Sequence, residues 1–128
     1  MNVDTLTTNL QLKSGSDGSA TQITLPNATA NALNAKHGIF FLTVLDTDSD
    51  VQIKVYMDDG PDGQDWRRND TEVLDTGASS DVQTGTYGGD TGSLVFGAWA
   101  RFRVEIQART GSTKVTAQVN LKAVWKPF

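Results

Sequence analysis

The sequence predicts an all-β fold, an antiparallel β-sandwich or jelly-roll-like domain of about eight strands that takes up residues 1–128 as a single domain. Several segments alternate apolar and polar residues with a period of two, which is typical of strands with one buried face. The composition, with 12 glycines, favours strands and turns. No segment has a convincing helical pattern. A chain of 128 residues is long enough to bury a core without disulfide bonds or structural metal sites.

The first part of the chain predicts two strands and a loop. Residues 5–13, TLTTNLQLK, alternate mostly leucine with polar residues, and the glycines of 14–19 predict a turn. Residues 21–25 form a short strand that Pro26 ends, because proline lacks the donor that a central strand needs. Residues 27–36 contain alanines, but asparagines oppose a helix there. We expect a loop or a single helical turn.

The middle of the chain predicts a hairpin followed by a long turn. Residues 38–46, GIFFLTVLD, are apolar on both faces, which indicates a strand in the middle of the core. Residues 51–57, VQIKVYM, alternate, and the short acidic link at 46–50 predicts that the two strands pair as a hairpin. Residues 58–66, DDGPDGQDW, are dense in turn residues and predict a long turn.

The last part of the chain predicts short strands and a closing hairpin. Short strands are expected at 71–76, near 80–87 and at 94–96. Residues 99–109 and 113–125 alternate regularly on either side of the turn TGS, so we expect a hairpin whose apolar side forms half of the sandwich core. The apolar sides consist of Phe102, Val104, Ile106 and Ala108, and of Val115, Ala117, Val119, Leu121, Ala123 and Trp125.

Charge and residue usage restrict the classes of function. The formal net charge is −4, from 11 basic and 15 acidic residues, which argues against a nucleic-acid partner. The chain has no cysteine, which excludes disulfides and thiolate metal sites and fits a protein that folds in a reducing cytoplasm. We expect no secretory signal and no membrane partner, because neither a basic segment before an apolar run nor a long apolar stretch is present.

The acidic turn at 46–50 begins like an EF-hand calcium loop. Asp46, Asp48 and Asp50 stand at alternate positions. Val51 then takes the position of the loop glycine, and Met57 that of the bidentate glutamate. We therefore expect a solvated hairpin turn here.

The acidic turn at 58–66 has four aspartates and two glycines, a composition that also fits a cation site. Aspartate caps its own backbone and glycine supplies positive φ, so the same residues are typical of an ordinary turn. We expect Trp66 to anchor this turn onto the sandwich, with no metal and no other cofactor. A weakly calcium-stabilised domain is the alternative.

The residues required for catalysis are scarce. His37 is the only histidine, and no G-x-S-x-G elbow accompanies a serine. The glycine-rich stretch TGTYGGDTGS lacks the lysine of a P-loop. We therefore predict that the protein is not an enzyme.

The aromatic residues leave two interpretations open. Trp66, Trp99 and Trp125 are expected to plug the ends of the sandwich, since large aromatic residues are mostly buried. Tyr56 alternates with inward residues and is expected to face outward. Aromatic rings exposed in a row would instead stack on sugar rings, so a carbohydrate-binding module, free or in a host-recognition fibre or tail, is the alternative function.

The chain resembles small β-sandwich proteins of tailed bacteriophage particles. The resemblance lies in the DGPDGQDW turn after the VQIKVYM strand and in the late segment WARFRVEIQARTGSTKVTAQVNLKAVW, and it covers the second and last thirds of the chain. It implies a virion structural protein without enzymatic activity, assembled in the host cytoplasm. Such a protein acts as a capsid decoration or cement protein, or in a head fibre, neck or tail, and braces the shell against packaged DNA.

The resemblance implies partners, and the residues suggest where they bind. The expected partners are the major capsid protein or other virion subunits and further copies of the chain, as a homo-oligomer. Arginine forms bidentate pairs with carboxylates, so arginines aligned on one face are expected to meet acidic groups of another subunit. A solvated polar face, with Glu105 and Lys122 as surface partners, is the alternative. The predicted interface residues are Arg101, Arg103, Arg109, Tyr56, Trp66 and Trp125.

Overall fold

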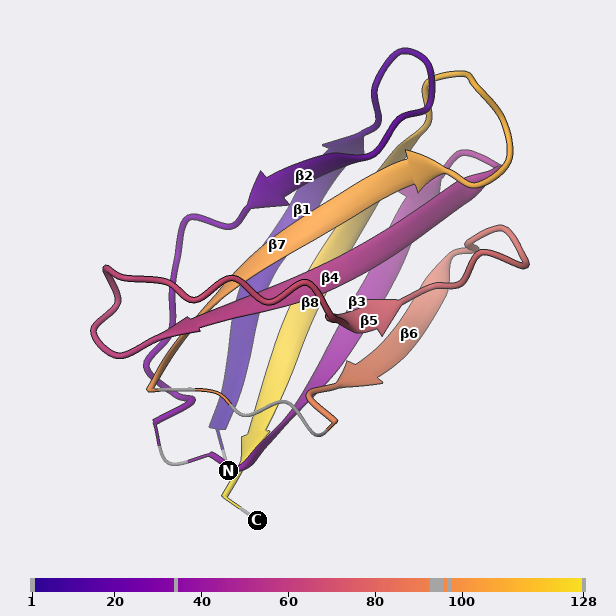
Figure 1. The fold of residues 1–128 in the computed structure, drawn as a ribbon. Coiled ribbons are helices and arrows are strands. Elements are labelled where there is room, and N and C mark those ends of the chain that lie inside the picture. The colour runs from indigo at the N-terminus through magenta and orange to yellow at the C-terminus, as the bar shows by residue number, and fades with distance from the viewer. Residues whose placement is uncertain (1, 34, 93–95, 97, 128) are drawn as a thin grey trace.

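The computed structural model describes residues 2–33, 35–92, 96 and 98–127, which contain eight strands and no helix (Figure 1). Two antiparallel four-stranded sheets pack against each other. In chain order the strands are β1 (Asn2–Lys13), β2 (Thr21–Thr24), β3 (His37–Thr47), β4 (Val51–Gly60), β5 (Glu72–Asp75), β6 (Gly85–Asp90), β7 (Trp99–Ala108) and β8 (Thr116–Lys126).

The strand order is that of a jelly roll. One sheet runs β1-β8-β3-β6 and the other β2-β7-β4-β5. The chain changes sheet at every connection except the one between β4 and β5. This arrangement of eight strands in two sheets is the double-sheet jelly roll. It confirms the predicted fold class.

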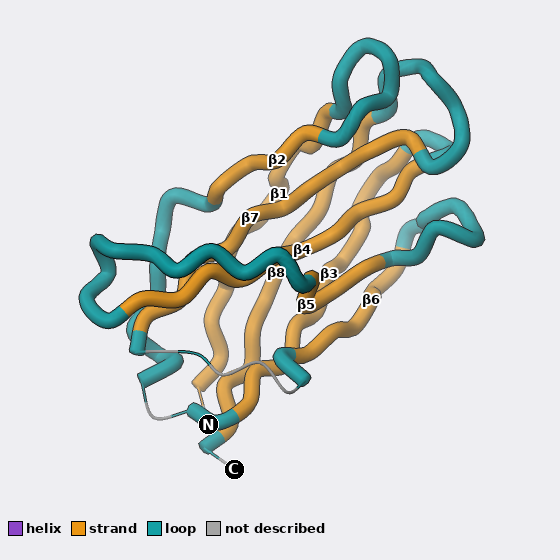
Figure 2. Tube along the Cα trace, in the orientation of Figure 1, coloured by secondary structure: helices purple, strands orange, loops and turns teal. Residues whose placement is uncertain are grey.

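Both predicted hairpins are wrong. β3 and β4 lie in opposite sheets, and so do β7 and β8, which face each other across the core (Figure 2). A period of two identifies the buried face of a strand but not its neighbour. Two strands that face each other from opposite sheets show the same alternation as a hairpin, so the pattern cannot separate the two cases.

The other predicted elements are found near the expected places. The segment 71–76 contains β5, and the strand expected near 80–87 is β6, a few residues later. The segment 27–36 forms turns, as expected, where its residues are described. The strand predicted at 94–96 lies largely outside the described residues. The long turn predicted from residue 58 begins later, because β4 continues to Gly60.

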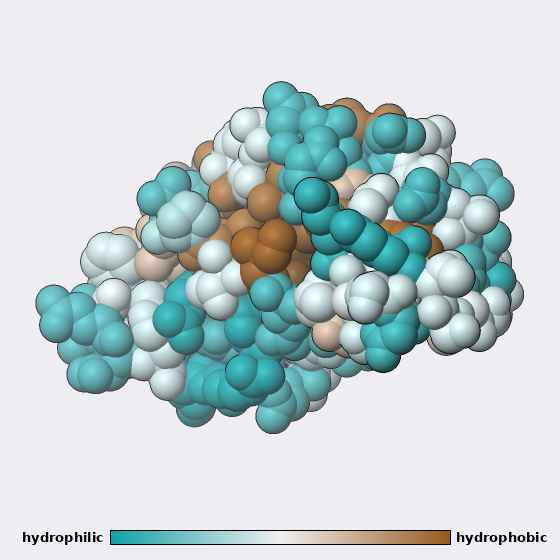
Figure 3. All heavy atoms as spheres, turned by 90° about the horizontal axis from the view of Figure 1, so that it is seen from above, coloured by the Kyte–Doolittle hydropathy of each residue, from teal (hydrophilic) through white to brown (hydrophobic). Residues whose placement is uncertain are grey.

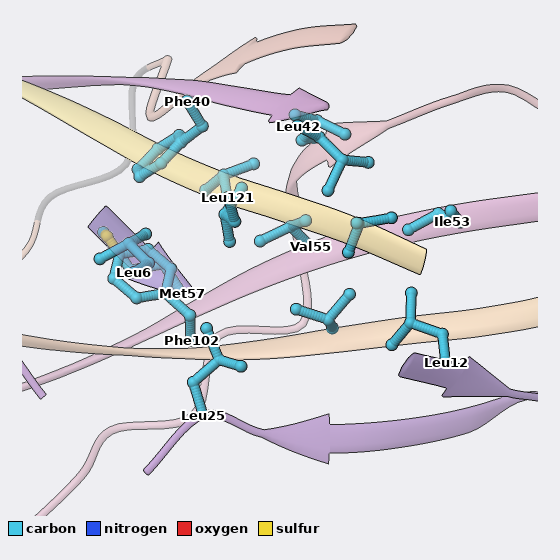
Figure 4. Close-up of a cluster of buried hydrophobic side chains, with 14 of the residues drawn as sticks. Leu6, Leu12, Leu25, Phe40, Leu42, Ile53, Val55, Met57, Phe102 and Leu121 are labelled. Atoms are coloured by element: carbon cyan, nitrogen blue, oxygen red, sulfur yellow. The ribbon is translucent and has the colours of Figure 1, made fainter. Parts of the chain in front are cut away.

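The core lies between the two sheets and is closed by aromatic rings (Figure 4). Phe40, Phe102 and Trp125 pack edge-on or tilted, with the Phe40 ring centroid 5.5 Å from Phe102 and 5.8 Å from Trp125. Offset geometries of this kind are favourable for aromatic pairs. Both sheets contribute, since Phe40 and Trp125 come from one and Phe102 from the other. The expectation that Trp125 plugs the sandwich is confirmed.

Apolar surface is not confined to this interior. Seen from above, hydrophobic residues lie in the middle of the view with hydrophilic residues around them (Figure 3). Among the described residues, five large hydrophobic side chains are exposed by a third or more. They are Val3, Ile23, Leu33, Phe41 and Leu45.

The edges of the two sheets meet at β5 and β6, and this approach requires glycine at residue 89. A Cβ atom there would lie 2.1 Å from the carbonyl oxygen of Val73. We expect Gly89→Ala to lower the free energy of unfolding by about 1–3 kcal/mol, because the edges must separate. Gly88 has open space where its Cβ would lie. Gly88→Ala, the matched control, should change stability by less than about 0.5 kcal/mol in the same urea titration.

Candidate functional site

The outer face of the sheet β2-β7-β4-β5 holds a charged group that we call the arginine cluster, made of Asp58, Arg101 and Arg103. Arg103 donates from Nε and Nη2 to the Asp58 carboxylate at 3.0–3.2 Å. Arg101 donates from Nη2 to Asp58 Oδ2 at 3.3 Å. The side chains of Asp58 and Arg103 are 1% and 4% exposed, although both project away from the core. Such an ion pair stays buried only because each charge has a partner.

Two aromatic rings complete the arginine cluster. The Arg103 guanidinium lies 4.8 Å from the centroid of Tyr56, and that of Arg101 lies 4.8 Å from the centroid of Trp66. These cation–π contacts hold each guanidinium in one position. Tyr56 faces outward, as predicted. Burial raises the pKa of the Tyr56 hydroxyl, and the nearby Glu105 carboxylate raises it further.

The cluster is buried because the loop 61–71 folds back over it (Figures 1 and 2). Arg103 Nη2 donates to the carbonyl oxygen of Asn69 at 2.7 Å, and the Asn69 amide side chain donates to the Met57 carbonyl at 2.9 Å. Nearer the end of β4, Arg67 donates from Nε and Nη2 to Asp59 at 2.9 and 2.7 Å. This pairing raises the pKa of Arg67. The loop is therefore fixed to β4 at Arg67 and Asn69.

The third predicted arginine lies away from the cluster. Arg109, at the other end of β7, donates from Nε to Asp81 at 2.8 Å. All three arginines pair with carboxylates of their own chain, Arg101 and Arg103 with Asp58 and Arg109 with Asp81. The contact of Arg101 and Arg109 with acidic groups of another subunit stays a prediction. The proposed surface pair is wrong. Glu105 and Lys122 lie in different sheets, and Glu105 instead accepts from Gln22.

The predicted interface residues thus divide by burial. Arg103 is 3% exposed and Trp125 is 2% exposed, so neither offers contact area to a partner, and we remove both from the predicted interface. Arg101, Arg109, Tyr56 and Trp66 are partly exposed and remain predictions. The sequence pattern did not predict that Asp58, Asp59 and Asn69 hold the loop in place.

A hollow of about 540 Å³ lies beside the cluster, at the end of β4. Volumes of this size are typical of small-molecule sites. Its lining combines Pro61, Trp66 and Ala98 with the acidic residues Asp59 and Asp65. The described lining residues are Asp59, Gly60, Pro61, Asp65, Trp66, Arg67 and Ala98. An aromatic ring beside hydrogen-bonding groups is chemically suited to a sugar ring.

The acidic turns serve as caps. Asp48 accepts the backbone N–H of Thr116 at 2.8 Å, and Asp62 accepts the N–H groups of Gln64 and Asp65, each at 2.9 Å. The described residues contain no group of three or more potential metal-ligating side chains. His37, the one histidine, lies with Nδ1 3.3 Å from the Thr91 hydroxyl.

Asp50 provides a pH-dependent cap. Its carboxylate accepts from the Thr110 hydroxyl and from the N–H groups of Thr110 and Gly111, and these bonds lower the pKa of Asp50 below 3.8. A lowered folded-state pKa stabilises the fold above pH 3.8, and this contribution is lost as the pH falls through the folded value. We expect the hydrogen-exchange protection of Gly111 to fall on acidification below about pH 4. In Asp50→Asn this acid-dependent step should disappear.

Within the described residues, no helix is both long and apolar enough to cross a membrane. The geometry defines a small jelly-roll β-sandwich with an internally paired charge cluster under a fixed loop. A scan against models of known protein families finds no match, and a search of curated proteins also finds none.

Proposed function

We propose that the protein is a structural component of a tailed-bacteriophage virion, a capsid decoration protein that binds the head surface and stabilises the shell. The observation that carries the proposal is the strand order, because the eight-stranded jelly roll is an architecture of viral capsid domains. The support is an analogy of fold. The sequence resemblance to small virion proteins points in the same direction.

The fixed loop supports the proposal on physical grounds. A cement protein must present the same surface in every copy, and a loop held by the Asp59–Arg67 and Arg103–Asn69 contacts meets this need. A preorganised surface loses little conformational entropy when it binds. Trp66 and Arg101 lie at the border of this loop and provide an aromatic residue and an arginine, the types enriched at binding hot spots.

Co-sedimentation tests the proposal. Purified protein is mixed with empty capsids assembled without it, and the pellet is examined by electron microscopy. We expect saturable binding at symmetric positions on the shell and a higher disruption temperature of the capsids. Absence from the pellet at every protein concentration would contradict the proposal.

Carbohydrate binding is a second candidate, favoured by the hollow next to Trp66. A sugar would place its apolar face near Trp66 and Pro61 and its hydroxyls near Asp65. A glycan array, followed by titration of tryptophan fluorescence, tests this candidate. Binding that Trp66→Ala abolishes would support it, and an array without signal would rule it out.

A further inference from the structure

The outer face of the sheet β1-β8-β3-β6 carries most of the exposed apolar side chains. Val3 is 64% exposed, Phe41 41% and Leu45 40%. The register places Val3, Val124 and Ile39 side by side across three strands, and the latter two are partly exposed. Isolated apolar residues on a surface are normal, but a contiguous group of this kind marks an interaction site.

The shape of this face is complementary to itself. Phe41 of β3 is directly opposite Gly88 of β6 in the register. No atom lies within 4 Å of where a Gly88 Cβ would be, so the exposed ring stands next to bare backbone. A two-fold axis between β3 and β6, parallel to the strands, exchanges these two positions. Each Phe41 ring then lies over Gly88 of the other copy.

The charges on the face fit the same axis. Lys122 and Lys126 of β8 lie on one side of β3, next to Phe41 and His37, and Asp90 of β6 lies on the other side, next to Ile39. The two-fold operation brings Asp90 of one copy above Ile39 of the other. There it lies between the two lysines of β8, so opposite charges meet on both sides of the axis. Symmetric dimers need such a self-complementary patch.

The area of contact follows from the position of the axis. Because β6 is the edge strand, only β3 and the six-residue β6 overlap directly, with the lysines of β8 beside them. The buried surface is therefore smaller than the roughly 800 Å² per partner of a standard interface, and we expect a weak, concentration-dependent dimer.

We propose that two copies of the chain associate through the β3 and β6 side of the outer face of this sheet, as a symmetric dimer with its axis between β3 and β6. The occupant of this face is therefore a second copy. The inference rests on the proposed function, for which it names the surface that joins decoration subunits to one another. The opposite sheet, with the fixed loop, stays available to the capsid.

Sedimentation equilibrium of the full chain tests the dimer. We expect a wild-type dimer and a dissociation constant raised at least about 30-fold by Phe41→Ser, as for an aromatic hot-spot residue. Gly88→Val should weaken the dimer similarly, because it fills the space that receives the ring. Ile23→Ser is the matched control, since Ile23 is exposed on the other sheet. A wild-type monomer, or a dimer unaffected by Phe41→Ser, would overturn the proposal.

Charge reversal tests the axis. The double variant Lys122→Asp, Lys126→Asp should weaken the dimer, and the addition of Asp90→Lys should restore it. If the triple variant stays monomeric while its thermal unfolding is unchanged, the proposed axis is wrong. Capsid binding is scored separately. A monomer that co-sediments with capsids contradicts only the dimer, and a dimer that does not co-sediment contradicts only the capsid function.

Discussion

Replacement of Arg103 with methionine is expected to lower the free energy of unfolding by about 3 kcal/mol, because Asp58 stays buried without its main countercharge. The two side chains are 4% and 1% exposed, so water does not replace the lost contact without a structural change. The carbonyl of Asn69 also loses its donor. A urea titration measures the change in stability, and hydrogen exchange of residues 61–71 should show the loop opening more often.

The neighbouring arginine is the matched control for this prediction. Arg101 makes a single hydrogen bond of 3.3 Å to Asp58, and its side chain is 32% exposed. Arg101→Met should therefore lower the free energy of unfolding by only about 1 kcal/mol. The double variant Asp58→Leu, Arg103→Met should recover most of the loss, since no charge remains buried without a partner. If Arg103→Met lowers the free energy of unfolding by less than Arg101→Met does, the buried ion pair does not hold the loop.

The sequence predicted burial well and partners poorly. The alternation of 99–109 correctly turned Phe102 toward the core and Arg103 away from it, because the direction of a side chain is a local property of a strand. Which strand lies next to β7 depends on the whole topology. The position of the loop that buries Arg103 on the outer face also depends on the whole topology. The sequence pattern alone therefore predicted an exposed arginine.

Asp58 and Asp59 show where a better prediction was possible. Their composition predicted a turn, yet both continue the alternation of β4, with Asp58 outward after Tyr56 and Asp59 following the inward Met57. Two acidic residues in phase with a strand, and arginines at outward positions of another, are a signal for cross-strand ion pairs. Asn69 gave no such signal, because its role depends on how the loop folds back.

Truncation of the central aromatic residue should be at least as costly as the loss of Arg103. Phe102 is fully buried, and its ring centroid lies 5.5 Å from Phe40 and 6.3 Å from Trp125, both of the opposite sheet. We expect Phe102→Ala to lower the free energy of unfolding by about 3–5 kcal/mol, through lost burial and the cavity left between the sheets. Guanidinium titration with an unchanged m-value would show that stability alone has changed.

Phe41→Ala is the control that separates packing within the subunit from packing between subunits. Phe41 comes from the same strand as Phe40 but projects from the outer face, where it is 41% exposed. Its truncation should therefore cost little in dilute protein, where subunits are apart. At higher concentration a dimer stabilises the wild type by mass action, and the difference between wild type and Phe41→Ala should grow. Phe102→Ala should lose the same stability at every protein concentration. If the stability lost in Phe41→Ala is equally independent of concentration, the Phe41 ring packs within its own subunit and the dimer contact is contradicted.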